Sequence, residues 1–245
     1  MRDSVTYAES PDLESHAQPA TGDKISSMTK TVEEYLADFR GVLRDEHYAL
    51  GERLLSIGTT VYFPDMYIIA GMKRSLSFLR GFADLVTSRN YMSAAPLVRL
   101  QLDNALRAAA IAMAPNPHDF AQRVLRGEHI RRLRDRDGEK LTDAHLCKKL
   151  SVQWPWVQRI YDQGSPYVHF SGMHMLVTFK EPDGAACDTF SISEDNELVP
   201  DDAYRDATNA FAGATFVFLQ YVKAWIREKQ RIQDDIARAA QRPQE

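Results

Sequence analysis

The run LVRLQLDNALRAAAIAM, from Leu97 to Met113, constrains the fold most because it places apolar residues on most faces of a helix. Apolar residues also recur at a spacing of three to four residues across the ranges 29–58 and 65–113, which is typical of amphipathic helices. The range 201–240 predicts one long C-terminal helix, whose first half is apolar enough to lie in a core. The sequence therefore predicts a mainly α fold, a helical bundle formed by a single domain over residues 29–245.

Three segments lack these long apolar faces. Residues 1–28 show no sustained period and are rich in Ser, Asp, Glu, Pro and Ala, which is typical of a disordered leader. Residues 118–163 combine short helical pieces with many arginines, and we interpret them as a basic short-helix insertion. Within 175–192, the segments MLVTF and DTFSI alternate β-branched or aromatic residues with others around Pro-Asp-Gly, which predicts one small inserted β-hairpin.

The composition excludes several classes of protein. The chain has 245 residues, a hydrophobic content of 44% and a formal net charge of −4, which suits a sizeable core and argues against a protein that coats nucleic acid. Cys147 and Cys187 offer no disulfide framework, so we expect a cytoplasmic protein. The N-terminus lacks the pattern of a signal peptide, and the most apolar run, 211–226, is shorter than a membrane span, so we expect no membrane contact.

The stretch QGSPYVHFSGMHM, residues 163–175, sets several polar side chains into a mostly apolar run. Ser165 followed by Pro166 matches a helix N-terminus, and Gly172 would end the turn before the hairpin. His169 would then lie about one turn in, where the positive end of the helix favours a neutral ring that can accept a proton. The structural alternative is a capped turn in which the histidine and the serines only satisfy backbone groups.

A polar stripe crosses the otherwise apolar helix predicted for the run Leu97–Met113. Arg99, Asp103 and Arg107 are spaced four residues apart, so they share one face. The stripe is either a surface ladder of ion pairs, worth about 0.3–0.5 kcal/mol per pair, or the wall of a cleft in which a guanidinium group clamps an anion. The sequence leaves both interpretations open.

A second group of cations lies in the basic insertion. Arg131, Arg132 and Arg134 belong to a cluster of arginines that Trp154 and Trp156 follow, and grooves for single-stranded nucleic acid combine cations with aromatic rings in this way. The alternative is a solvated helix face. We predict no metal site, because the pairs of His and Cys residues lack a third ligand at zinc spacing. A Ser-His-Asp hydrolase lacks support because no Gly-x-Ser-x-Gly elbow is present. No glycine-rich phosphate loop is visible, and we predict no cofactor.

Two of these places resemble a loose group of bacterial helical proteins of the DUF5677 type, related in architecture to HEPN domains. That group shows a helix of the form LxRxxxE and a later S-x-x-V-H-x-S segment. The helix motif is present here as Leu97-Val98-Arg99 with Asp103, an aspartate where glutamate is commoner. The later motif is present as Ser165, Val168, His169 and Ser171, with Tyr161 and Tyr167 beside it. The resemblance covers roughly residues 65–225 and implies a bundle in which the arginine helix faces the histidine segment.

HEPN relatives include metal-independent ribonucleases of toxin–antitoxin and antiphage systems, together with many inactive interaction modules. Their active signature is an arginine followed at short spacing by a histidine, whereas here Arg159 precedes His169 by ten positions. In such a ribonuclease, His169 would act as acid or base at the 2′-hydroxyl or the leaving oxygen. Arg99 or Arg159 would stabilise the charge on the phosphorane.

Two hypotheses of function follow. The first is a bacterial cytoplasmic effector that acts on RNA or a nucleotide, with its catalytic and its binding side chains in one cleft. The catalytic set would be His169, Arg99, Asp103 and Ser165, and the binding set would be Tyr167, Ser171, Arg107, Arg159, Arg131, Arg132 and Arg134. The second is a non-catalytic helical interaction module, which would form a homodimer or hold a partner protein through the helices of 65–113 or the C-terminal helix.

Overall fold

The computed structural model describes residues 30–168, 171–176, 178–180, 189–190, 192, 196 and 198–240. Thr31–Glu245 forms one compact unit, and its described part is mostly helical. The predicted mainly α class is therefore confirmed. The leader predicted over residues 1–28 and the predicted catalytic residue His169 lie outside the described residues.

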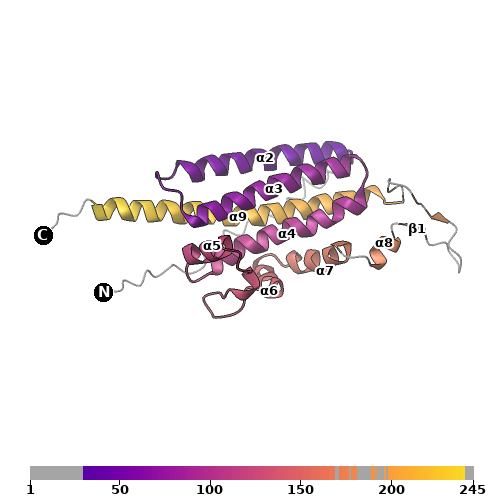
Figure 1. Cartoon of the computed structure of the whole chain (residues 1–245). Helices are drawn as coiled ribbons and strands as arrows, with labels where there is room; N and C mark the ends of the chain where they lie inside the picture. Colours follow the sequence, from indigo (N-terminus) through magenta and orange to yellow (C-terminus); the bar gives the residue numbers. More distant parts are fainter. Residues whose placement is uncertain are drawn as a thin grey trace. The chain divides into compact units, whose positions relative to one another are not determined.

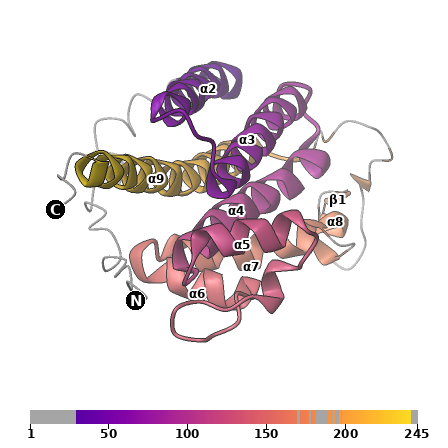
Figure 2. The same cartoon turned by 60° about the vertical axis from the view of Figure 1, so that its left-hand side comes forward.

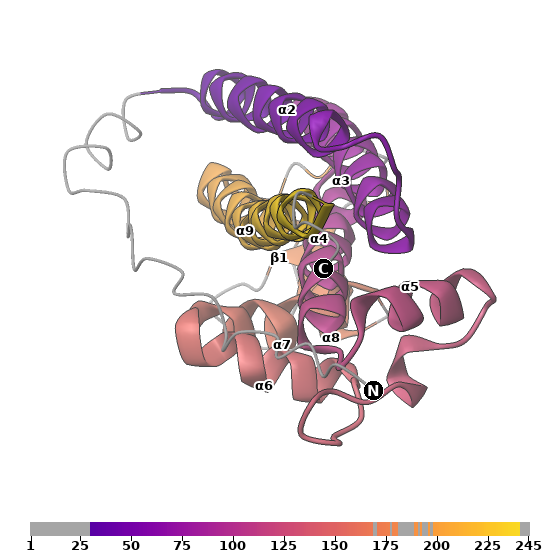
Figure 3. The same ribbon diagram turned by 90° about the vertical axis from the view of Figure 1, so that its left-hand side faces the viewer.

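In the described part of the chain, four long helices form the bundle (Figure 1). They are α2 (Val32–Ser56), α3 (Phe63–Thr87), α4 (Tyr91–Met113) and α9 (Asp201–Ala240). Helix α4 is central, because it packs against α9, α3 and the shorter helices α5, α6 and α7. Figure 3 shows α2, α3 and α9 on one side of α4 and the shorter helices α6 and α7 on the other.

The shorter elements follow α4 along the chain. They are α5 (Pro117–Leu125), η1 (Ile130–Arg132), α6 (Asp143–Gln153), α7 (Trp156–Val168), α8 (Gly172–Leu176), β1 (Phe179–Lys180) and β2 (Thr189–Phe190). Helices α5, α6 and α7 lie along α4, as Figure 2 shows, and they occupy the range interpreted above as a basic insertion. The insertion is thus a layer of the bundle, because α7 and α6 each cover part of the face of α4 that carries the polar stripe.

Side-chain caps explain where several helices begin. Thr31 accepts a hydrogen bond from the N–H of Glu34, whose carboxylate accepts from the N–H of Thr31, so α2 starts with a capping box. Asn90 caps α4 by accepting from the N–H of Ser93. Each cap satisfies an N–H group that a helix start leaves unpaired.

The helix start predicted at Ser165 is wrong. Helix α7 continues through Ser165 and Pro166 to Val168, and the Ser165 hydroxyl donates to the carbonyl of Tyr161 at 2.8 Å. Gly172 begins α8 instead of ending a turn. Packing of α7 against α4 and α6 explains the difference, because it stabilises helix across a local signal for a helix start, and a serine inside a helix can bond the carbonyl four residues back.

The β-hairpin predicted over 175–192 is not supported. Met175 and Leu176 lie in α8, and the described pairing is limited to two residues on each side, with Phe179 opposite Phe190. Thr178 donates through its hydroxyl to the carbonyl of His174 at 2.8 Å. Local hydrogen bonds of the helical kind therefore outweigh the β-propensity of MLVTF, which depends on cross-strand neighbours to be effective.

Helix α9 carries the most apolar run of the chain into the core. Phe211 stacks on Phe82 with ring centroids 4.5 Å apart, and Phe218 and Val222 are also buried. Towards its C-terminus the helix leaves the core, and residues 234–240 are exposed throughout. None of the helices in the described part combines the length and the apolar character that a membrane span requires.

A chain of buried polar side chains joins all four long helices. The ring of His47 bonds the Leu43 carbonyl through Nδ1 at 2.7 Å, so in the neutral ring Nδ1 donates and Nε2 accepts from the Ser75 hydroxyl at 2.9 Å. The amide of Gln101 donates to the hydroxyls of Ser75 at 2.7 Å and Thr215 at 2.9 Å. A shift of any one helix would leave a buried polar group unpaired, so the network fixes their register.

A buried ion pair ties α9 to the first turn of α3 and, through a hydrogen bond, to the last turn of α2. The Lys229 ammonium lies 3.0 Å from Asp65, and their side chains are 2% and 0% exposed. Lys229 also donates to the carbonyl of Leu54 at 3.1 Å, and Trp225 donates to the second oxygen of Asp65 at 2.7 Å. Both charges are therefore fully compensated inside the protein.

We expect Lys229→Met to lower the free energy of unfolding by about 3 kcal/mol or more, because Asp65 would lose its countercharge while remaining buried. Lys223→Met is the matched control on the same helix, since Lys223 pairs with Glu46 where both side chains are about one-third exposed. Removing that pair should change stability by less than about 1 kcal/mol. Equal losses in urea-induced unfolding of the two variants would contradict the assignment.

The His47 ring also predicts a pH dependence. Burial lowers its pKa below the ordinary value of 6.5, so the unfolded chain binds the proton more tightly than the folded one. The free energy of unfolding is therefore not reduced by this ring above pH 6.5, and it declines as the pH falls below 6.5 and the unfolded chain takes up the proton. In His47→Gln, which keeps a donor and an acceptor but does not titrate, the loss of stability between pH 7.5 and 5.5 should be smaller by up to about 1.4 kcal/mol per pH unit. Identical pH profiles in urea-induced unfolding would contradict it.

Candidate functional site

The polar stripe predicted on α4 lies under α6 and α7. Arg107 bonds Asp103 at 2.6 Å and Asp143, the first residue of α6, at 2.5 Å. Arg99 lies 3.5 Å from the other oxygen of Asp143, and its guanidinium group covers the ring of Tyr161 at 4.2 Å. The Arg99 side chain is only 12% exposed. The stripe is therefore neither a ladder in open water nor the free wall of a cleft.

A further arginine completes this cluster from α3. Arg74 donates to Asp103 at 3.0 Å and to the side-chain oxygen of Asn104 at 2.6 Å. We call this group the Asp143 cluster: Arg74, Arg99, Asp103, Arg107 and Asp143. Each of its two aspartates bonds two of its three arginines, so the cluster ties α3, α4 and α6 together.

Local sequence explains how α6 and α7 come so close to α4. Thr142 caps α6 by accepting from the N–H of His145, which places Asp143 at the positive end of the helix, where a carboxylate is favoured. On α7, Gly164 packs directly on Arg99, and a Cβ atom there would lie 3.1 Å from the Cβ of Arg99. The missing side chain lets α7 approach α4 closely enough to cover the cluster.

The remaining described residues of the predicted site either contact other parts of the protein or lie apart from the Asp143 cluster. The ring of Tyr167 packs edge-on against Tyr91 at 5.8 Å. Burial raises the pKa of the Tyr91 hydroxyl, and a hydrogen bond with Tyr167 raises it further. The Ser171 hydroxyl donates to the carbonyl of Pro166 at 2.8 Å, and Arg159 is exposed on α7. The predicted approach of His169 to Arg99 stays a prediction, since His169 lies outside the described residues.

Two of the predicted catalytic residues, Asp103 and Ser165, already use the groups that acid–base catalysis would need. Each oxygen of Asp103 bonds an arginine, which occupies the lone pairs that a general base would use. Ser165 donates its hydroxyl proton to a backbone carbonyl. Across the described ranges, no group of three or more His, Cys, Asp or Glu side chains is placed to hold a metal ion. These residues stabilise the fold and offer no free acid or base.

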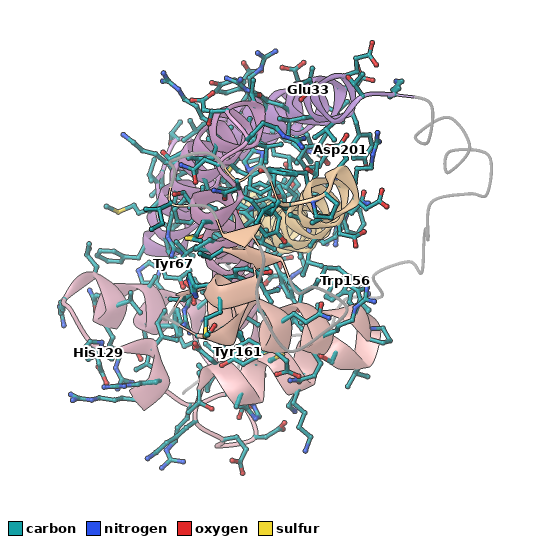
Figure 4. All side chains as sticks on the ribbon, turned by 90° about the vertical axis from the view of Figure 1, so that its right-hand side faces the viewer. Glu33, Tyr67, His129, Trp156, Tyr161 and Asp201 are labelled. Atoms are coloured by element: carbon teal, nitrogen blue, oxygen red, sulfur yellow. The ribbon has the colours of Figure 1, made fainter. Side chains whose placement is uncertain are left out.

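The arginines of the basic segment, in contrast, are exposed. Arg131 and Arg132 form the end of η1, Arg134 follows, and His129, which precedes η1, marks this surface in Figure 4. A cleft of about 270 Å³ opens beside them. We call it the arginine cleft, and it is lined by Ala114, Pro115, Asn116, Asp119, Phe120, Arg123, Arg132, Leu133 and Arg134.

A tight turn holds one side of the arginine cleft in place. The buried carboxylate of Asp135 accepts from the N–H groups of Asp137 at 3.0 Å and Glu139 at 2.8 Å, and it bonds His145 at 2.7 Å. Burial would raise the pKa of Asp135, but the hydrogen bonds from His145 and the backbone outweigh it and hold that pKa below its ordinary value. The turn is thus built around an ionised carboxylate, which fixes the chain that follows Arg134.

The cations of the arginine cleft differ in how far they are neutralised. Arg123 bonds Glu128 through two nitrogens at 2.8 Å, and Arg134 donates to the carbonyl of Gly138 at 2.5 Å. Arg131 and Arg132 form no ion pair within the part of the chain that the structure describes. Guanidinium groups without a carboxylate partner remain available to an anion from solution.

Sequence reasoning missed Asp143, Arg74 and the wall of the arginine cleft formed by Asn116. Thr142 before Asp143 is a recognisable helix-start signal, and Asn116 before Pro117 is another. These signals place the residues at helix ends but do not say which distant side chain each one meets. Asp143 meets Arg107 across 36 positions of the chain, and only the fold brings them together.

Comparison of the chain with protein-family models, with curated proteins and with solved structures returns no match. The resemblance to the DUF5677 type and to HEPN domains therefore stays a prediction.

We expect Asp143→Asn to lower the free energy of unfolding by about 1.5–3 kcal/mol, because Arg107 and Arg99 would lose a charged hydrogen-bond partner beneath α6 and α7. Glu139→Gln removes the same charge from an exposed side chain nearby and should have little effect. Urea-induced unfolding measures both. The cluster would not be a structural tie if the two variants were equally stable.

Proposed function

We propose that the protein is a binding module for a phosphate-bearing ligand, RNA or a nucleotide, and that the arginine cleft is its contact site. The observation that carries the proposal is that Arg132 and Arg134 are exposed beside a cleft of about 270 Å³ and have no carboxylate partner in the described chain. Guanidinium groups match the geometry of phosphate oxygens and bond them in pairs.

The other walls of the cleft suit such a ligand. Asn116 supplies an amide beside the arginines, and Phe120 lines the apolar side. Asp119 contributes one negative charge, which is partly balanced by Arg123 at 3.6 Å. The cleft therefore combines a surplus of cations with a polar and an apolar wall, as sites for phosphate groups attached to a base or sugar do.

The net charge of the whole chain limits the mode of binding. At −4, the protein repels a polyanion except where cations gather. Contact should therefore be local, confined to a few phosphates and weakened by salt, because exposed charges are screened beyond about 8 Å at physiological ionic strength. This is the expected behaviour of a module that binds a short segment or a single nucleotide.

Binding rather than cleavage is favoured by the state of the predicted catalytic residues. Asp103 and Ser165 bond other parts of the protein and offer no free group for general acid–base work. Arg99 lies against Asp143 and Tyr161, and its side chain is only 12% exposed. The proposal therefore joins the RNA or nucleotide ligand of the first hypothesis to the non-catalytic module of the second. A cytoplasmic location belongs to the same proposal.

The test is the affinity for a short single-stranded RNA as a function of salt, measured by fluorescence anisotropy. Wild-type protein should bind at low salt, and Arg132→Ala/Arg134→Ala should bind more weakly, with the slope of log affinity against log salt reduced by about 1.4 for two lost phosphate contacts. Arg53→Ala/Arg227→Ala removes the same charge from exposed arginines elsewhere and should keep the wild-type slope.

Two outcomes would overturn the proposal: no binding by wild-type protein at low salt, or equal losses in the two double variants. The same samples also separate binding from cleavage. If the protein only binds, the RNA recovered after incubation stays full length on a denaturing gel, whereas shortened products would favour the ribonuclease hypothesis.

A further inference from the structure

A groove of about 580 Å³ lies between α2 and α3, and we call it the α2–α3 groove. Its apolar lining consists of Tyr48, Gly51, Leu55, Ile69, Met72, Leu76 and Leu79. Its charged lining consists of four cations, Arg40, Arg44, Lys73 and Arg80, and one carboxylate, Glu52. The groove therefore offers both an apolar floor and a positive charge, and neither the arginine cleft nor the Asp143 cluster contributes to it.

The apolar side chains of the groove are arranged in two rows along the helices. Tyr48 and Leu55 are seven residues apart on α2, and they are 57% and 56% exposed. Ile69 and Leu76 have the same spacing on α3. Positions seven residues apart lie on one face of a helix, about 10 Å from each other. Two parallel rows of this length form a track into which a third helix can pack.

The cations of the groove begin about one turn in from its mouth. Leu55 and Ile69 lie near the connection between α2 and α3, whereas Arg40 and Arg80 lie towards the opposite ends of these helices. Arg40 and Arg80 share a single carboxylate, Asp84, each at 3.8 Å, and Arg44 pairs with Asp45 at 3.0 Å. Lys73, one turn of α3 beyond Ile69, forms no ion pair in the described ranges. The groove is thus apolar at its mouth and has an unpaired cation one turn further in.

The same chain presents a helix that fits this track. Residues 234–240 of α9 are exposed on all sides, although they include Ile236, which is 53% exposed. Ile232 lies one turn earlier on the same face. Asp234 and Asp235 lie between the isoleucines, and Asp235 pairs with Arg231 at 3.2 Å and with Arg238 at 2.7 Å. The exposed end of α9 is therefore apolar on one face and carries one net negative charge, at Asp234.

The end of α9 leaves the protein beside the mouth of the groove. Gln233 donates to the hydroxyl of Tyr62 at 2.9 Å and packs against Gly58. Tyr62 and Gly58 both belong to the connection between α2 and α3. In Figure 1, α9 continues past this connection in a straight line. A straight helix cannot fold back into its own groove. Two copies placed with these ends together, however, can each lay α9 along the groove of the other.

We propose that two copies of this chain form an isologous dimer in which residues 234–240 of α9 in each copy dock in the α2–α3 groove of the other. Ile232 and Ile236 would cover Leu55 and Ile69 at the mouth of the groove. Asp234 would then lie near Lys73, which is one turn of α3 beyond Ile69. The reciprocal exchange closes the assembly at two subunits and covers the exposed apolar side chains of both. The dimer does not depend on the proposed RNA contact.

The first test is the mass of the protein in solution, measured by light scattering after size exclusion over a wide range of concentration. Wild type should be a dimer, and Ile236→Asp and Leu55→Asp should each raise the dissociation constant by about tenfold or more. Both side chains are exposed within one chain, so the variants should keep the wild-type circular dichroism. Val152→Asp makes the same change at a side chain of α6 that is 84% exposed, and it should leave the dimer intact.

The second test separates docking of α9 in the groove from other dimers. A mixture of Ile236→Asp and Leu55→Asp retains one intact α9 end and one intact groove, so it should form a heterodimer although each variant alone is monomeric. Contact between two α9 ends would leave Leu55→Asp dimeric by itself. Three results would each overturn the proposal: a monomeric wild type, a wild-type dissociation constant for Ile236→Asp or Leu55→Asp, or a mixture of the two variants that stays monomeric. A monomeric wild type would leave the groove as a site for a helix of another protein.

Discussion

The burial of α4 on nearly every side is the constraint on which the rest of the structure depends. Its alanines, such as Ala105 and Ala109, have no exposed surface, and neighbouring helices can therefore approach its backbone closely. Burial of this kind requires every polar side chain on α4 to find a partner. Gln101 and Asn104 find theirs on α3 and α9, and Asp103 finds its partners in arginines. Over the described residues, no buried side-chain nitrogen or oxygen lacks a hydrogen bond.

The need to pair buried polar groups changes the interpretation of the arginines on α4. An arginine, an aspartate and another arginine four residues apart on a helix look like a site, because these groups can bind an anion. In the bundle they meet Asp143 and Arg74 instead, so the charges that suggested chemistry hold three helices together. Cations that the fold leaves uncompensated are a better guide to function. In the described part of the chain they include Arg131 and Arg132 and, in the α2–α3 groove, Lys73.

The two proposed surfaces belong to different parts of the bundle and have different physical character. The arginine cleft lies among the short helices that follow α4, is small, and is dominated by guanidinium groups. The α2–α3 groove lies between two long helices, is larger, and combines an apolar floor with charged side chains along its length. A phosphate-bearing ligand suits the first and a helix suits the second. An assembly that uses both would present two arginine clefts, which raises the effective concentration for a ligand that reaches both.

The sequence by itself determined the helical class and the span of the longest helices, because a period of three to four apolar residues is a local property of the chain. The range predicted as 201–240 is the range of α9. What only the tertiary structure decided is the path of α7 through Ser165, the short pairing in place of a hairpin, and the partners of Arg99 and Arg107. These depend on which segments pack together, and packing energy exceeds the local preference of a serine cap or of a β-branched run.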